Sequence, residues 1–181
     1  MTHVILQEYY ENQPNDMFIN YAKQYSDMPF VIMLDEDENG YKAGRFLRAS
    51  DLGMSGENNE WKPVIQDKLS QQLLVPNGTM GQRWEEGKKW NLKLETEDGT
   101  PIDPLLSMAE SDYHVDTIQF PYFDSSGDGI FERPIATRTI QLANGEKVKI
   151  ATVYDLMTSQ YGVQRFEHEL EATSYDDASS K

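Results

Sequence analysis

Arg45 and Arg48, in the segment GRFLRASDL, are the side chains of this chain best suited to bind an oxyanion. A guanidinium group presents a planar fork of N–H donors that matches the geometry of such an anion. The chain is strongly acidic, however, and Asp51 and the acidic residues 36–38 supply carboxylates nearby. We therefore expect both arginines to form ion pairs within the protein, and an anion-binding role is the alternative.

Two acidic turns have the spacing with which a calcium-binding EF-hand loop begins. Their candidate ligands are Asp35, Asp37, Asn39 and Gly40 in the first turn, and Asp124, Ser126, Asp128 and Gly129 in the second. Neither loop ends correctly, because the position of the bidentate glutamate holds Phe46 in the first and Ile135 in the second. We expect solvated acidic turns at both places, with calcium binding at the second turn as the stronger alternative.

No other residue pattern indicates a reaction centre. The chain has no cysteine, which excludes disulfides, thiolate zinc sites and cysteine-bound iron–sulfur clusters within it. His3, His114 and His168 are far apart in the sequence, and no serine lies in a GxSxG motif. Phosphate-binding motifs such as GxGxxG are also absent from the sequence. The sequence therefore predicts no catalytic, cofactor-binding or metal-binding residue in this chain.

The charge of the chain argues against nucleic acid as a partner. Its 181 residues carry a formal charge of -15, so it repels phosphate backbones unless a basic face is segregated. Acidic sequence follows Lys88 and Lys89, and Lys147 and Lys149 alternate along a predicted strand, as solvent-facing charges do. No apolar run approaches the roughly 20 residues that span a bilayer, and no secretion signal is recognisable. We expect a cytoplasmic chain without direct membrane insertion.

The hydrophobic content is low for a domain of this length. Leaving out tyrosine and counting glycine, the apolar share is about 39%, against roughly 45–50% in ordinary globular domains. Two explanations remain open: neighbouring segments supply part of the apolar contact surface, or the domain is rich in loops.

Helices are predicted at both ends of the chain. Residues 1–28 form a helical start, in which Asn15 caps the second helix and Pro29 follows its end. Residues 152–171 are helical, because Thr152 and Asp155 have capping-box spacing and apolar residues recur beyond a break at Gly162. The tail 172–181 has no apolar periodicity and is expected to be loose.

Residues 29–151 are expected to be mainly β structure. Residues 30–34 can pair with 41–47, and residues 139–142 and 147–153 flank Asn144-Gly145, a preferred hairpin dipeptide. Further candidate strands are 61–66, 73–75 and 90–96, and Asp103-Pro104 suits the opening of a short helix near 104–110. Five aromatic residues are expected to fill the core, with a contact surface as the alternative: Trp61, Trp84, Trp90, Tyr122 and Phe123.

Several longer motifs resemble one enzyme family over essentially the whole chain. They are YSDMPFVIMLDEDENGYKAGRFLRASDL (25–52), EWKPV (60–64), VPNGTMGQRW (75–84), GKKWNL (87–92), FPYF (120–123), LANGEKVKIATVYDLMTSQYG (142–162) and ATSYDD (172–177). These motifs resemble an internal segment of the catalytic α subunit of membrane-bound respiratory nitrate reductase, a molybdenum enzyme.

The resemblance implies a parent protein that reduces nitrate to nitrite with electrons from quinol. That parent would bind a molybdenum bis-pterin guanine dinucleotide and an iron–sulfur cluster. Its partners would be an iron–sulfur β subunit and a haem-bearing membrane subunit, on the cytoplasmic face of the cell membrane. The family's metal ligands lie in segments without a counterpart here, so Asp51, Asp103 and Asp155 are not expected to bind molybdenum.

The sequence thus predicts one α+β domain, with antiparallel β-hairpins and helices at the N- and C-terminal ends. Its expected role is that of a non-catalytic structural part of the α subunit. The alternative is a free-standing interaction module that docks on other nitrate reductase segments or subunits, for which an exposed apolar patch would be the sign.

Overall fold

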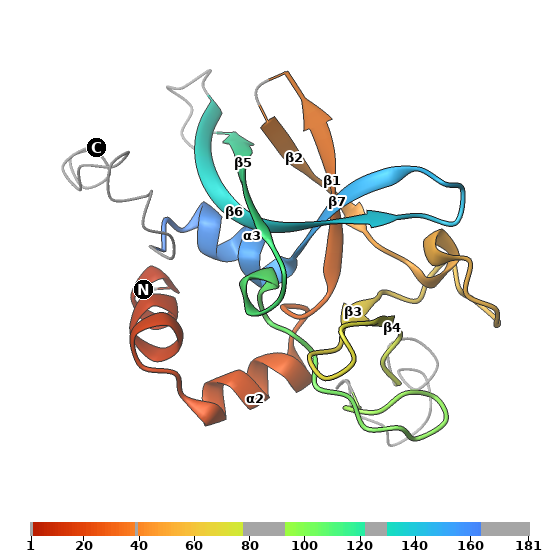
Figure 1. The fold of residues 1–181 in the computed structure, drawn as a ribbon. Helices are drawn as coiled ribbons and strands as arrows, with labels where there is room; N and C mark the ends of the chain where they lie inside the picture. Colours follow the sequence, from red (N-terminus) through yellow and green to blue (C-terminus); the bar gives the residue numbers. More distant parts are fainter. Residues whose placement is uncertain (1, 39, 78–92, 122–129, 164–181) are drawn as a thin grey trace.

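A closed β-barrel forms the centre of the fold (Figure 1). The computed structural model describes residues 2–38, 40–77, 93–121 and 130–163. The strand order around the barrel is β1-β2-β5-β6-β7. These strands are β1 (Val31–Asp37), β2 (Gly40–Phe46), β5 (His114–Pro121), β6 (Ile130–Gln141) and β7 (Lys147–Thr152).

A parallel pairing between β2 and β5 closes this otherwise antiparallel barrel. Tyr41 is the register partner of Ile118 there, whereas the other neighbouring strands run antiparallel. At the start of β2, a Cβ atom on Gly40 would lie 2.6 Å from the backbone oxygen of Thr117. The φ angle of Gly40 is +145°, a conformation that L-residues rarely adopt. The close approach of β2 to β5 therefore requires glycine at this position.

Two buried clusters fill the space around the strands. Val31 and Ile32 enter different clusters, because successive side chains of a strand point to opposite faces. The first cluster consists of Val31, Leu47, Val64, Met108, Ala136 and Ile150. The second consists of Ile32, Leu34, Ile118, Phe120, Ile135 and Ala151.

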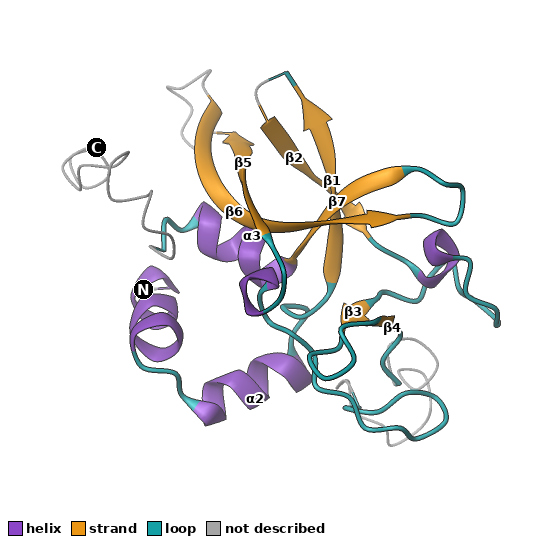
Figure 2. Cartoon of the chain, viewed as in Figure 1, coloured by secondary structure: helices purple, strands orange, loops and turns teal. Residues whose placement is uncertain are grey.

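Helices from the two ends of the chain pack beside each other below the barrel (Figure 2). The helices are α1 (Thr2–Leu6), which continues as a π-helical segment (Gln7–Asn12), α2 (Asp16–Tyr25) and α3 (Val153–Gln160). A third buried cluster joins them through Leu6, Ala22, Leu106, Tyr154 and Val163. The N- and C-terminal parts of the described chain thus share one core.

A two-stranded sheet and two short 3-10 helices complete the described fold. The sheet pairs β3 (Ile65–Gln66) with β4 (Leu73–Leu74). The 3-10 helices are η2 (Ala49–Leu52) and η4 (Met108–Glu110). Isolated bridges, among them Asp67 with Pro104, connect the loops around the sheet.

The predicted fold class is confirmed, and the strongest local predictions hold. Both predicted hairpins form, as β1-β2 and β6-β7. The Asn15 side chain caps α2 by accepting hydrogen bonds from the backbone N–H groups of Met17 and Phe18. The capping box of Thr152 and Asp155 opens α3, and Gly162 has a φ of +65° just beyond its end.

The short helix predicted near 104–110 begins later than expected, and the predicted β region contains strands that the sequence did not single out. No helix opens at Asp103-Pro104, since Pro104 pairs with Asp67, and the helical turn begins only at Met108, with Ser107 as its cap. Strand β5 and the first part of β6 were not singled out, because their apolar residues do not alternate regularly along the sequence and each contains a proline, Pro121 or Pro134. Residues 78–92, 122–129 and 164–181, including the C-terminal helix and tail predictions, lie outside the described residues.

Candidate functional site

The guanidinium group of Arg45, the foremost candidate for binding an anion, pairs within the protein. It donates from Nη1 to Asp51 Oδ2 and from Nη2 to Asp51 Oδ1, both at 2.7 Å. Asp51 Oδ2 also accepts the backbone N–H of Arg48 at 2.9 Å, which fixes the start of η2. Such a two-pronged pair uses the fork that an external oxyanion would need. The predicted ion pair is therefore confirmed.

Arg48 departs from the expected ion pair, because its guanidinium group contacts a backbone carbonyl and an indole ring instead. Its Nη1 donates to the backbone oxygen of Glu60 at 2.7 Å, and its guanidinium carbon lies 5.6 Å from the ring centroid of Trp61. Trp61 is 58% exposed, so the prediction that it fills the core is wrong. The ring stacks on the arginine at the surface instead. The other aromatic residues of that prediction, Trp84, Trp90, Tyr122 and Phe123, lie outside the described residues.

The Arg45–Asp51 pair predicts a pH dependence of stability. The hydrogen bond from Arg45 is the main cause that holds the pKa of Asp51 below its ordinary value of 3.8, against the opposing effect of burial. A carboxyl group whose pKa is lower in the folded chain stabilises the fold above its unfolded pKa, and this contribution is lost as the pH falls through the folded value. We expect Asp51→Asn to lower the free energy of unfolding by about 1 kcal/mol at pH 7, given the partial exposure of the pair.

Urea unfolding at pH 7, 4 and 3 measures this effect. The deficit of Asp51→Asn should shrink below about pH 4, because the wild-type carboxylate then becomes protonated as well. Arg45→Gln is the matched variant, since it removes the same pair from the other side and should show the same trend. A deficit that stays constant from pH 7 to pH 3 would contradict the assignment.

The first acidic turn does not form a calcium loop among the residues described. Residues 35–37 continue β1, and Asp37 forms an ion pair with Lys42 on the facing strand. The pKa of Asp37 is lowered chiefly by its hydrogen bond with Lys42. Within the described ranges, no three or more His, Cys, Asp or Glu residues gather in a way that could hold a metal ion. Asn39 and the second turn, from Asp124 to Gly129, lie outside these ranges, so the solvated turn stays the prediction there and calcium binding its alternative.

Of the three aspartates excluded as molybdenum ligands, Asp103 pairs with Lys23. This ion pair connects α2 to the loop after β4, and the Lys23 side chain is only 10% exposed. Asp51 pairs with Arg45, as described above. Both carboxylates therefore hold parts of this chain together.

Asp155 is the centre of the most buried polar network in the described part of the chain. Its residue is 0% exposed, and its Oδ1 accepts a hydrogen bond from the hydroxyl of Ser107 at 2.6 Å. Its Oδ2 accepts the backbone N–H of Met108 at 2.8 Å and lies 2.8 Å from Thr152 Oγ1. Thr152 Oγ1 also lies 2.6 Å from the backbone oxygen of Leu106. One carboxylate thus caps α3 and anchors the segment before η4.

Local spacing predicts only half of this network. The capping box between Thr152 and Asp155 is visible in sequence, because its members are three residues apart. Ser107 is 48 residues away from Asp155, and no local pattern links them. The sequence S-x-x-E at Ser107 has capping-box spacing and marks the start of η4, but it does not indicate the contact with Asp155.

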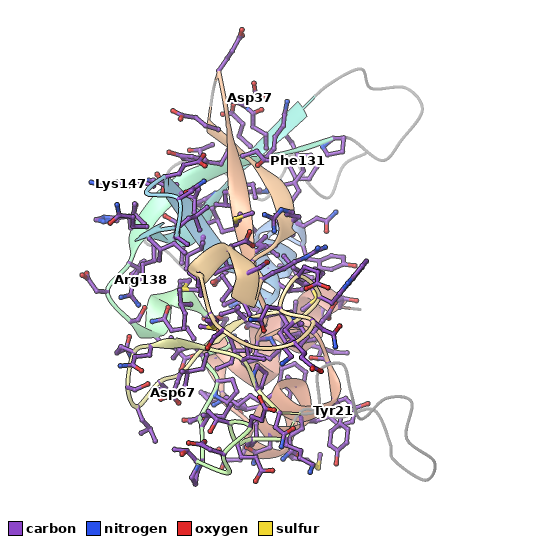
Figure 3. All side chains as sticks on the ribbon, turned by 90° about the vertical axis from the view of Figure 1, so that its right-hand side faces the viewer. Tyr21, Asp37, Asp67, Phe131, Arg138 and Lys147 are labelled. Atoms are coloured by element: carbon purple, nitrogen blue, oxygen red, sulfur yellow. The ribbon has the colours of Figure 1, made fainter. Side chains whose placement is uncertain are left out.

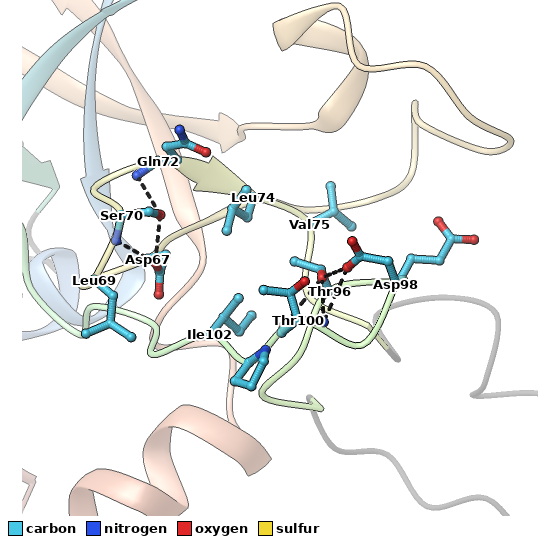
Figure 4. Close-up of a pocket in the computed structure, with 12 residues that line it drawn as sticks. Asp67, Leu69, Ser70, Gln72, Leu74, Val75, Thr96, Asp98, Thr100 and Ile102 are labelled. Atoms are coloured by element: carbon cyan, nitrogen blue, oxygen red, sulfur yellow. Dashed lines mark hydrogen bonds between the residues drawn. The ribbon is translucent and has the colours of Figure 1, made fainter.

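A surface hollow of about 630 Å³ lies beside the β3-β4 sheet (Figure 4). Asp67 is 4% exposed there, and its Oδ2 accepts hydrogen bonds from the backbone and hydroxyl of Ser70, as Figure 4 shows. Burial opposes the charged form of Asp67, but these bonds and those from backbone N–H groups hold its pKa below the usual range. Asp98 similarly accepts hydrogen bonds from Thr96 and Thr100. The carboxylates of Asp67 and Asp98 therefore accept hydrogen bonds from groups of the chain itself.

Lys149 departs from its predicted role as a solvent-facing charge. Its Nζ lies 2.6 Å from Oδ1 and 2.5 Å from Oδ2 of Asp116, and its side chain is 23% exposed. The ammonium group also lies 5.1 Å from the ring centroid of Tyr41. This contact connects β7 to β5 and β2 across the barrel, which the alternation along one strand cannot show.

The described histidines are separate from each other. His3 lies 2.8 Å from the backbone oxygen of Tyr161 through Nδ1, and His114 is exposed at the start of β5. His168 lies outside the described residues. Among the residues described, Arg45 and Asp51 line a surface hollow of about 500 Å³ together with Asp35. Arg48, Asp103, Asp155 and the two described histidines do not line it. The ion pairs and hydrogen bonds described above link elements of the chain to one another.

Three curated proteins illustrate what the chain is similar to. It is 44% identical over 178 residues to the nitrate reductase α chain of Bacillus subtilis, covering 98% of this chain and 14% of the relative. It is 37% identical to the respiratory nitrate reductase 1 α chain of Escherichia coli, with 98% and 15% covered. It is 35% identical to the nitrate reductase α subunit of Mycobacterium tuberculosis strain H37Rv, with 91% and 13% covered. No family model matches the chain.

The chain is therefore similar, over nearly its whole length, to a region internal to nitrate reductase α chains, which confirms the predicted resemblance. It spans about one seventh of the length of these relatives.

Proposed function

We propose that this chain is a non-catalytic structural domain of the α subunit of a respiratory nitrate reductase. The whole subunit would reduce nitrate to nitrite with electrons that come from quinol. The observation that carries the proposal is the match of 98% of this chain to about one seventh of a nitrate reductase α chain. The structural use of Arg45, Asp51, Asp103 and Asp155 supports it, because none of these side chains is left to act on a substrate.

The cofactors of the whole subunit would be a molybdenum bis-pterin guanine dinucleotide and an iron–sulfur cluster, held elsewhere. Two features of this chain support this assignment elsewhere. The sequence has no cysteine to ligate a cluster, and the arginines described, which could bind phosphates, donate to Asp51 or to backbone carbonyls. We therefore assign no cofactor ligand to this chain.

The proposed partners are the remaining segments of the α subunit, an iron–sulfur β subunit and a haem-bearing membrane subunit. The proposed location is the cytoplasmic face of the cell membrane. In the ranges that the structure describes, no helix combines the length and the apolar character needed to cross a bilayer. Any attachment to the membrane is proposed to occur through the partner subunit.

Nitrate reduction with reduced viologen as the electron donor tests the absence of catalysis in this chain. We expect no turnover of nitrate by the purified 181-residue chain, and turnover by the nitrate reductase from the same cells as the positive control. Turnover by the purified chain alone would contradict the proposal.

The alternative is a free-standing interaction module that docks on other nitrate reductase segments or subunits. Exposed apolar residues on α2 favour it. The mass of the native polypeptide in its source cells separates the two functions. A polypeptide much longer than 181 residues supports the structural domain, and a native product of this length supports the module. A pull-down from anaerobic, nitrate-grown cells that recovers no nitrate reductase segment would exclude the module.

A further inference from the structure

The outer face of α2 carries a row of exposed apolar and aromatic side chains. Met17, Tyr21 and Tyr25 are 80%, 62% and 47% exposed. They are four residues apart along the helix, so they lie on one side of it. The rings of Tyr21 and Tyr25 are 5.3 Å apart between their centroids. Figure 3 shows Tyr21 at the edge of the molecule, on the side away from Asp67.

The buried face of α2 keeps the row of Met17, Tyr21 and Tyr25 pointing away from the core. Ala22 is buried in the cluster that joins both ends of the chain, and Phe18 and Ile19 pack against that cluster. Lys23 reaches inward as well, where it pairs with Asp103. Rotation of the helix would break these contacts, so the helix cannot turn its outer row toward the core.

The outer face is also poor in charge, in a chain with 31 acidic residues. The neighbours of the row on the exposed side are mostly neutral: Asn20 is exposed, Gln24 is half-buried, and Asp16 stands at the first turn of the helix. An acidic residue in the first turn complements the helix dipole. Protein interfaces have this composition at their centre, where charges are depleted and tyrosine and methionine are enriched.

We propose that the row of Met17, Tyr21 and Tyr25 is the surface on which the remaining part of the nitrate reductase α chain packs. This inference rests on the proposed function and names the face that serves it. The match covers only 14% of the Bacillus subtilis relative, so most of such a polypeptide lies outside this chain. For this reason we assign the remaining part of the α chain as the partner that covers the row. A second copy is a poorer occupant, because each copy carries a formal charge of -15 and the two would repel each other.

Photo-crosslinking in the nitrate reductase assembled in its source cells tests the proposal. Benzoylphenylalanine replaces Tyr21, and mass spectrometry identifies the peptides joined to it after illumination. Leu69 is the matched control position, because it is 78% exposed and lies beside the hollow of the β3-β4 sheet. We expect crosslinks from position 21 to α-chain peptides outside residues 1–181, at least fivefold more abundant than those from position 69.

A charge substitution in the row tests the same contact without the crosslinking residue. Met17→Lys is expected to lower the amount of assembled α subunit at least tenfold, because it places an unpaired charge in the contact, whereas Leu69→Lys changes it less than twofold. Circular dichroism of the isolated chain should show equal melting temperatures for both variants, since both sites are exposed. Equal effects of the two variants on assembly would overturn the proposal, and so would crosslinks from position 21 confined to residues 1–181.

The outcomes also separate this inference from the proposed function. A native polypeptide of only 181 residues contradicts the structural-domain function, yet crosslinks from position 21 to a separate α-chain peptide would still support the docking face. A long native polypeptide without such crosslinks would support the function and contradict the docking face.

Discussion

Replacing Asp155 by alanine is expected to lower the free energy of unfolding by about 3 kcal/mol or more. The carboxylate is fully buried and accepts hydrogen bonds from Ser107 Oγ and the backbone N–H of Met108, besides its contact with Thr152. Its removal takes away a shared buried acceptor of Ser107 and Met108, and the buried site gives water little access to replace it. Because the network links α3 to the segment before η4, both elements should loosen together.

Thermal and urea unfolding followed by circular dichroism measure this effect. The melting temperature should fall by about 10 °C, since 1 kcal/mol corresponds to roughly 2–4 °C in a chain of this size. Asp155→Asn should cost less, because the amide oxygen still accepts from one side. Asp112→Ala is the matched control at an exposed aspartate and should change the free energy of unfolding by less than about 0.5 kcal/mol. A loss from Asp155→Ala no larger than that of the control would show that the network does not stabilise the fold.

Gly40→Ala is expected to destabilise the chain by about 3 kcal/mol or more, through the junction of β2 and β5. Two costs combine at this position. The φ angle of +145° is unfavourable for an L-residue, and the added Cβ would lie 2.6 Å from the backbone oxygen of Thr117. A backbone atom cannot move aside as the end of a side chain can, so β2 and β5 must separate. Their pairing through Tyr41 and Ile118 closes the barrel, and its loss would expose the second cluster.

Two other glycines separate these costs. Gly99 has a φ of +83° but no atom within 4 Å of an added Cβ, so Gly99→Ala should cost only about 1 kcal/mol from backbone strain. At Gly44 an added Cβ would lie 2.7 Å from the backbone oxygen of Met33, so Gly44→Ala tests the close contact between β1 and β2. Urea unfolding of the three variants should rank Gly40→Ala as the most destabilised. Equal losses for Gly40→Ala and Gly99→Ala would mean that the contact with Thr117 has no effect.

The resemblance to nitrate reductase α chains depends on longer motifs, and the comparisons support it over nearly the whole chain. The pairing of Arg45 with Asp51 was also predictable, because the two residues are six positions apart and have opposite charges in a strongly acidic chain. The pairing of Lys149 with Asp116 was not, since the period of a strand shows which residues share a face but not which strand lies beside it. Trp61 was predicted to be buried because tryptophan is a large apolar residue. The structure places its ring on Arg48 at the surface, and residue type alone cannot show such a contact.

The sequence by itself determined the local elements of this protein: the hairpin at Asn144-Gly145, the cap of α2 at Asn15 and the capping box of α3. Each depends on residues only a few positions apart, whose backbone conformations and hydrogen bonds are fixed by local geometry. Only the tertiary structure decided the closure of the barrel and the network around Asp155. Both join segments separated by dozens of residues, and such contacts form only when the chain packs its apolar surface.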